Sequence, residues 1–201
     1  MDAEALNLEK IAAGKALLDC GASDSLGGVE AIEAAIDRSH KMYGEDEECV
    51  SVDTTDRPTY KFGNANKQQV LSKVTVRVKP GGEKPGDLNV HAHDAKGVPI
   101  LLSAKALRSL GAIVNFATGQ AVMQQLNARK VVQLERSDID HLWFSLFEEM
   151  PTVSTDPYDL IDGGHTENMI DQADSTEPST VTPQPSPSQS TFATLPALPS
   201  N

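Results

Sequence analysis

The sequence predicts a mostly β domain with one or two short helices, followed by a disordered C-terminal tail. Short apolar or alternating segments recur through the first 150 of the 201 residues. Turn-forming Gly, Pro and Asn residues separate these segments at intervals of about eight to twelve residues, a spacing typical of β barrels and sandwiches. After Pro151 a Pro-rich, acidic stretch replaces them. The first 150 residues are therefore expected to contain the folded core.

The first strand of chemical interest is expected at residues 16–18, an Ala-Leu-Leu run that ends on Asp19. A short apolar run of this kind fits a buried strand that leads into a turn. Residues 3–13, before it, are rich in good helix formers but lack sharp periodicity, so their structure is left open. The segment 29–39 places Val and Ile at helical spacing, which predicts a one-sided amphipathic helix.

The stretch from Tyr60 to Val78 has the pattern of two strands around a turn at residues 63–66, whose Gly and Asn residues tolerate positive φ. The second arm alternates Val with polar residues, which predicts one buried and one wet face. Ser103 is placed to cap a short helix that runs to Leu110, with Gly111 as its stop signal. Further strands are expected at residues 88–93, 98–102, 112–116, 120–123, 130–134 and 141–147.

The tail begins at Pro151 and contains eight of the twelve prolines, seven acidic residues and no Lys or Arg. It includes a low-complexity run over residues 178–190. Such a segment buries too little apolar surface to offset its ordering entropy, so residues 151–201 are predicted to be disordered. A solvated linker is favoured over a specific acidic docking motif.

The charge pattern argues against nucleic acid as a partner. The formal charge is −12, and residues 1–150 hold 22 acidic against 17 basic residues without a clustered basic face. The N-terminus lacks the pattern of a secretory signal, and no apolar run approaches the roughly 18 residues that cross a bilayer. An intracellular, cytoplasmic protein without a membrane partner is expected. Cys20 and Cys49 are then expected to be reduced thiols.

The order of residues around Asp19 fits half of an aspartic protease site. Such a site holds two carboxylates so close that they share one proton, because like charges at that distance cannot both ionise cheaply. One carboxylate then acts as a base on water, and its protonated partner polarises the scissile carbonyl. Placing each carboxylate requires an apolar strand, an Asp at its end and a Gly-containing turn, the order found in residues 16–22. An ordinary turn has the same pattern, so the motif alone is weak.

Three blocks together resemble the retropepsin domain of copia-type retrotransposon polyproteins. The similarity covers residues 12–125 and rests on the order and spacing of these blocks. They are Asp19-Cys20-Gly21-Ala22-Ser23, Phe62-Gly63-Asn64, and Pro99-Ile100-Leu101-Leu102-Ser103 with Leu107, Leu110 and Gly111.

The resemblance implies a closed, mostly β barrel that becomes an enzyme only as a homodimer. Residues 126–150 would add strands or a dimerisation segment. The activity would be peptide hydrolysis, with the segments of a polyprotein as substrate and without a cofactor or a metal. Asp162, in Asp-Gly-Gly, is the nearest candidate for a second motif, and no apolar strand precedes it. The implied roles are catalysis for Asp19, the active-site turn for Cys20, Gly21 and Ala22, the flap for Phe62, Gly63 and Asn64, and support beneath the site for Leu101, Leu102 and Ser103.

Cys20 departs from the family pattern, which usually has Ser or Thr at this position. That hydroxyl helps to join the two active-site turns, and a thiol is a weaker hydrogen-bonding group. A decayed or domesticated copy, acting as a dimerisation or peptide-binding module, is therefore the alternative function. Cys20 as a hydrolase nucleophile is disfavoured against a plain buried thiol, because no histidine motif places a base near it.

Two other segments leave alternatives open. His91 and His93, at alternate strand positions and followed by Asp94, could hold a metal, but no further ligand lies at a recognisable spacing. A solvated strand edge is therefore favoured over a metal site. The aromatic segment 141–147 fits an ordinary core strand and a dimer interface equally well.

Overall fold

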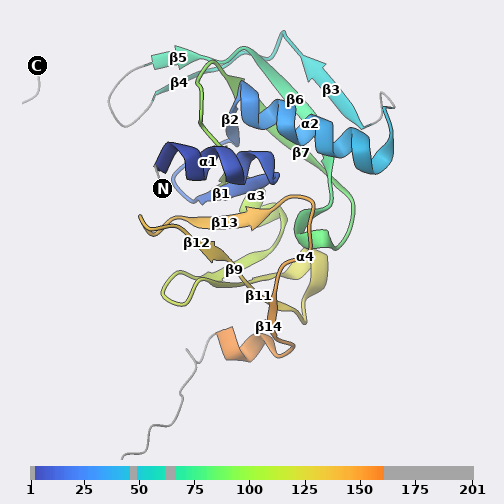
Figure 1. Ribbon diagram of the computed structural model, residues 1–201, viewed down its shortest axis with the longest axis vertical. Helices are drawn as coiled ribbons and strands as arrows, with labels where there is room; N and C mark the ends of the chain where they lie inside the picture. The colour runs from blue at the N-terminus through green and yellow to red at the C-terminus, as the bar shows by residue number, and fades with distance from the viewer. Residues whose placement is uncertain (1–2, 46–48, 62–66, 161–201) are drawn as a thin grey trace, which may run out of the picture. The chain divides into compact units, whose positions relative to one another are not determined.

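The structure is a computed structural model and describes residues 3–45, 49–61 and 67–160. Its described part is a strand-rich mixed α/β fold built on an eight-stranded sheet (Figure 1). The strands lie in the order β12 (Glu135–Arg136), β13 (Leu142–Ser145), β1 (Lys15–Asp19), β8 (Ile100–Ser103), β2 (Leu26–Gly28), β7 (Gly86–His93), β6 (Ser72–Val78) and β3 (Val50–Asp53).

The prediction of a strand-rich domain is confirmed, but the prediction of a closed barrel is wrong. The large sheet ends at β12 on one side and at β3 on the other, and these edge strands do not pair with each other. β12 is two residues long, and β3 is mostly exposed. The sheet is also mixed, because β1 runs parallel to β8, and β2 runs parallel to β7, among antiparallel neighbours. Closure requires the edge strands to meet in register, and they do not.

Two helices cover the large sheet near its centre (Figure 1). α2 (Val29–Tyr43) packs against β2, β6 and β7, with Ala31, Ile32 and Ala35 buried. The helix predicted from residue 29 is confirmed, and it extends beyond residue 39. Residues 3–13, whose structure the sequence left open, form α1 (Ala3–Ala12), which contacts α2 and β1. Neither these nor the other described helices are long and apolar enough to cross a membrane.

The second sheet has four strands, in the order β14 (Thr152–Ser154), β11 (Val131–Gln133), β10 (Gln120–Met123) and β9 (Ala112–Asn115). Ala121, Met123 and Val132 of this sheet share a core cluster with Phe144 of the large sheet, whereas Val122 and Val131 form a separate small cluster with Leu160. The strands predicted around 112–116, 120–123 and 130–134 are confirmed. β14 and the 3-10 helix η2 (Pro157–Leu160) lie in the segment predicted to be disordered from residue 151. The remainder of that segment, 161–201, lies outside the described residues.

A short helix follows β8 as the sequence predicts. Ser103 caps α3 (Ala104–Ser109), because its Oγ accepts a hydrogen bond from the amide of Ala106 at 3.2 Å. Gly111, just after the helix, has a φ of 60°, a conformation that glycine adopts without strain. Two further short helices are η1 (Pro80–Gly82) and α4 (Gln124–Asn127).

A separate two-stranded hairpin precedes β6. It pairs β4 (Thr59–Lys61) with β5 (Lys67–Gln69). The second arm, predicted as one strand up to Val78, is divided into β5 and β6. Between these strands Val70 is fully buried, and its amide donates to the carbonyl of Pro58. The predicted turn at 63–66 lies outside the described residues.

Candidate functional site

Asp19 is the last residue of a central strand in the large sheet. β1 pairs with β8 on one side, in parallel, and with β13 on the other, in antiparallel orientation. Ala16, Leu17 and Leu18 are all buried, so the run is apolar on both faces. The predicted buried strand that ends on Asp19 is therefore confirmed.

The Asp19 carboxylate is oriented by the turn that follows it. Its Oδ1 accepts hydrogen bonds from the amides of Gly21, at 2.9 Å, and Ala22, at 3.2 Å. These contacts close an Asx-type turn and fix the side chain while it remains partly exposed. A side chain at Gly21 would place its Cβ only 3.3 Å from Oδ1, so glycine allows the close approach.

A second layer of contacts supports this turn from β8. Ser103 lies opposite Asp19 in the parallel register, and its amide donates to the Oγ of Ser25 at 3.2 Å. The amide of Ala104 donates to the carbonyl of Ala22 at 3.1 Å. Of the two leucines expected beneath the site, Leu102 is buried in the core and Leu101 faces the same groove as Asp19. The structure thus brings the predicted turn and the predicted support together.

Asp19 and Cys20 lie in an open groove of about 700 Å³. The floor is apolar and includes Leu17, Leu101 and Trp143. One side is formed by two loops that sequence reasoning did not connect with the site, because they are far from Asp19 in the chain. They are the loop after β9, with Phe116, and the loop between β12 and β13, with Ser137, Asp138, Ile139 and His141.

Cys20 is exposed, which corrects the expectation of a buried thiol. The residue follows the last position of β1, where the chain leaves the sheet. His141 lines the same groove, although no sequence motif connects it with Cys20. Both cysteines are free thiols, and Cys49 is the buried one.

A polar cluster lies on another side of the turn, in a cavity of about 570 Å³. The hydroxyl of Tyr60, from β4, donates to Oδ2 of Asp24 at 3.2 Å and lies 3.3 Å from Nδ1 of His91. Since the single phenolic proton goes to Asp24, His91 is the donor to the phenolic oxygen. Lys105 forms an ion pair with Asp24 at 3.6 Å. The β4–β5 hairpin is thereby tied to the residues that follow the Asp19 turn.

Burial changes the pKa values of this cluster. Burial, followed by the charge of Asp24 and the hydrogen bond to it, raises the pKa of Tyr60 to about 12. Burial also lowers the pKa of His91, against the opposing effect of the Asp56 and Asp24 carboxylates. Both shifts favour the neutral forms of the two rings.

Replacing Tyr60 by Phe is expected to lower the free energy of unfolding by about 1–2 kcal/mol, because Asp24 and the buried His91 each lose a partner. Urea denaturation at neutral pH measures this change, with the exposed Tyr158→Phe as the control. The raised pKa of Tyr60 stabilises the fold below about pH 10, and this contribution is lost as the pH approaches 12. An absorbance titration of phenolate should lose its highest component in Tyr60→Phe, and an unchanged titration would contradict the assignment.

The other predicted site residues divide into two groups. The flap residues Phe62, Gly63 and Asn64 lie outside the described residues. His91 is not on a solvated edge, because β7 lies between β2 and β6 and the side chain is buried. Within 3–45, 49–61 and 67–160, no group of three or more His, Cys, Asp or Glu is arranged to hold a metal ion.

The aromatic segment from residue 141 forms the core strand β13. Trp143, Phe144 and Phe147 are buried within the single chain. Since a dimer anchor must be accessible in the free subunit, the core alternative is the one that the structure supports.

Comparison with models of known protein families found no match to the chain, and comparison with curated proteins found none either.

Proposed function

We propose that this chain is an aspartic endopeptidase of the retrotransposon type, active as a homodimer in which each copy supplies Asp19. The observation that carries the proposal is the placement of Asp19. Its carboxylate ends a buried central strand, is oriented by two backbone amides and lies in an open groove with an apolar floor. The retropepsin resemblance of residues 12–125 supports the same assignment.

In the proposed reaction, the two Asp19 carboxylates of a dimer share one proton. The ionised carboxylate takes a proton from water, whose oxygen attacks the peptide carbonyl carbon. The protonated partner donates to the carbonyl oxygen and gives a tetrahedral diol. Collapse of the diol breaks the C–N bond, with a proton passing to the leaving nitrogen. Because one carboxylate must be protonated and the other ionised, cleavage should be favoured at acidic to mildly acidic pH.

The substrate of the proposed enzyme is an extended polypeptide, namely the junctions of the polyprotein to which such a domain belongs. The chain needs no cofactor for this chemistry, because both proton transfers use carboxylates. Cys20 provides the reason for a second candidate function. Its thiol takes the place of a hydroxyl that would join the two turns, and a weaker junction favours a noncatalytic dimerisation or peptide-binding module.

A mixing experiment tests the homodimer directly. Parent chain and Asp19→Asn chain are co-refolded at several ratios, and the cleavage of a peptide library is measured at constant total concentration. If both copies must supply Asp19, an equal mixture should retain about one quarter of the activity of the pure parent. Activity proportional to the parent fraction would mean that each copy works alone, which would contradict the dimer. Dimers that bind peptides without turnover would favour the second candidate.

A further inference from the structure

Two exposed apolar side chains form a wall beside Asp19. Phe116 is 53% exposed and Ile139 is 72% exposed, yet both line the groove that contains Asp19 and Cys20. They come from different loops, one after β9 in the second sheet and one between β12 and β13 in the first. Apolar side chains that line a groove together with a few polar groups are typical of ligand-binding sites. We use the term apolar wall for Phe116 and Ile139.

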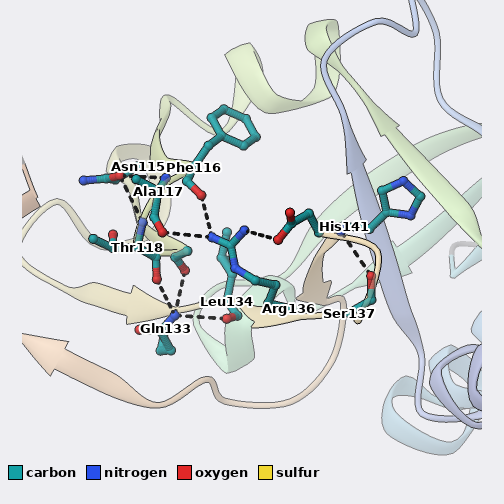
Figure 2. Close-up of polar contacts among 11 residues, drawn as sticks. Asn115, Phe116, Ala117, Thr118, Gln133, Leu134, Arg136, Ser137 and His141 are labelled. Atoms are coloured by element: carbon teal, nitrogen blue, oxygen red, sulfur yellow. Dashed lines mark hydrogen bonds and ion pairs between the residues drawn. The ribbon is translucent and has the colours of Figure 1, made fainter.

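Arg136 joins the two loops that carry the apolar wall (Figure 2). Its Nη2 donates to the carbonyls of Phe116, at 2.5 Å, and Ala117, at 3.2 Å. Its Nη1 binds Oδ1 of Asp140 at 2.9 Å, within the loop that carries Ile139. One planar guanidinium therefore fixes the spacing of the loops, a geometry that a lysine ammonium does not reproduce.

Further hydrogen bonds hold each loop in place. Oδ1 of Asn115 accepts bonds from the amides of Ala117 and Thr118, and Nε2 of Gln133 donates to the carbonyls of Thr118 and Gly119. In the other loop, the amide of His141 donates to Oγ of Ser137 at 3.1 Å. Figure 2 shows the ring of Phe116 directed away from these polar contacts. The loops are thus pre-organised, which lowers the entropy lost when a ligand binds.

The charged residues that line the groove favour one class of ligand. Its lining contains the carboxylates of Asp19 and Asp138, and no Lys or Arg belongs to its described lining. Arg136 is not among the residues that line the groove, and its guanidinium binds Asp140 and the two carbonyls. A ligand that enters the groove therefore meets apolar surface next to negative charge, which complements an apolar group adjacent to a cation.

A second copy of the chain is a poorer occupant of the apolar wall. In a twofold contact the same patch of each copy meets, and while the Asp19 pair of the proposed dimer shares a proton, Asp138 adds a further repelling carboxylate from each copy. The groove has no basic side chain in its described lining to neutralise that repulsion. A peptide with a basic residue has no such penalty.

From these observations we infer that the apolar wall is a specificity-determining subsite for an extended peptide that presents an apolar side chain next to a basic one, and that Arg136 is its positioning residue. The inference deepens the proposed protease and rests on it for the cleavage of that peptide. The binding itself does not require turnover.

The test uses fluorescence anisotropy to measure the binding of a fluorescein-labelled Gly/Ser octapeptide with a central Lys-Leu pair to full-length Asp19→Asn, whose groove keeps the Asp138 carboxylate. Adding Phe116→Ser and Ile139→Ser should weaken binding about tenfold or more, the effect expected from removing an apolar pocket wall. Replacing leucine by serine, or lysine by glutamate, in the peptide should have a similar effect. Val52→Ser, at a 56% exposed position on β3, is the matched control and should bind as Asp19→Asn alone.

Arg136→Lys tests the positioning role in the chain that retains Asp19. Its KM for the Lys-Leu peptide should rise about tenfold while kcat changes by less than about twofold, because the reacting carboxylate is untouched. The KM for a peptide with serine in place of leucine should not change, whereas a general loss of structure would affect both peptides. Retention of the parent KM for the Lys-Leu peptide would overturn the positioning role.

The outcomes separate this inference from the proposed function. Equal binding in the wall variants and Val52→Ser, or no binding to Asp19→Asn, would overturn the subsite. A shift of the monomer–dimer equilibrium in Ile139→Ser with unchanged peptide affinity would assign the wall to a second copy and also overturn it. Wall-dependent binding without cleavage by the parent chain would support the subsite and count against the protease. Cleavage by the parent chain that is unchanged in the wall variants would support the protease and not the subsite.

Discussion

Replacing Asp19 by Asn is expected to reduce kcat for peptide cleavage at least about a thousandfold, because an amide cannot accept a proton from the attacking water. The fold should survive, since Oδ1 of Asn can still accept hydrogen bonds from the amides of Gly21 and Ala22. Chromatographic quantification of products from a peptide library, between about pH 4 and pH 7, measures the effect across the range where carboxylates titrate. Thermal unfolding verifies that the variant is folded.

Cys20→Ser is the matched control for this prediction. Cys20 and Asp19 are adjacent in the groove, and a cysteine hydrolase would lose its nucleophile in this variant. An aspartic mechanism predicts that Cys20→Ser keeps or increases activity, because a hydroxyl is the stronger hydrogen-bonding group. Equal rates for Asp19→Asn and the parent would refute the aspartic mechanism. Loss of activity only in Cys20→Ser would assign the chemistry to the thiol.

The largest effect on stability is expected for Phe144→Ala, which should lower the free energy of unfolding by about 3–5 kcal/mol. Phe144 is 1% exposed, lies at the centre of β13 and belongs to the cluster that joins the two sheets. Its removal leaves a cavity next to Ala16, its register partner on β1, whose side chain is too small to fill the space. Urea denaturation monitored by circular dichroism measures the change.

Phe116→Ala provides a comparison with the same chemical change at an exposed position. Because that ring is largely in solvent, the stability should change by less than about 1 kcal/mol. A loss below about 1 kcal/mol in Phe144→Ala would mean that the two sheets do not depend on this contact. Similar m-values for both variants and the parent are needed for the comparison.

Local patterns made the Asp19 turn predictable. Residues 16–18 form a short apolar run, Asp19 and Gly21 follow, and Ser103 begins a helix that Gly111 ends. Each of these features depends on neighbours in sequence, for which strand, turn and cap preferences are informative. The groove wall could not be found in this way. Phe116 and Ile139 reach the groove only through tertiary packing, and no local sequence pattern predicts this placement.

Many of the individual strands and helices were predictable from the sequence, but the pairing of the strands was not. Alternation identifies the strand at Ser72–Val78, but it does not say which strand lies beside it. The open sheet follows from the pairings of β12 and β3, which depend on contacts distant in sequence. The composition after residue 151 also gave no sign of β14, because this strand is defined by its pairing with β11, which is distant in sequence. Leu160, buried with Val122 and Val131, gives this segment a small core of its own.

The pairing of β1 with β13 determines when the large sheet can be completed during synthesis. The first strand of the sheet emerges early from the ribosome, but residues 143–145, which pair with it, are made near the end of the folded segment. Until then one side of the Asp19 strand is an unpaired edge, open to wrong partners. A fragment that stops at residue 125 lacks this partner, so a minimal domain must extend to Ser145. The Asp19 turn therefore lacks its complete structural surroundings until residues 143–145 have been made.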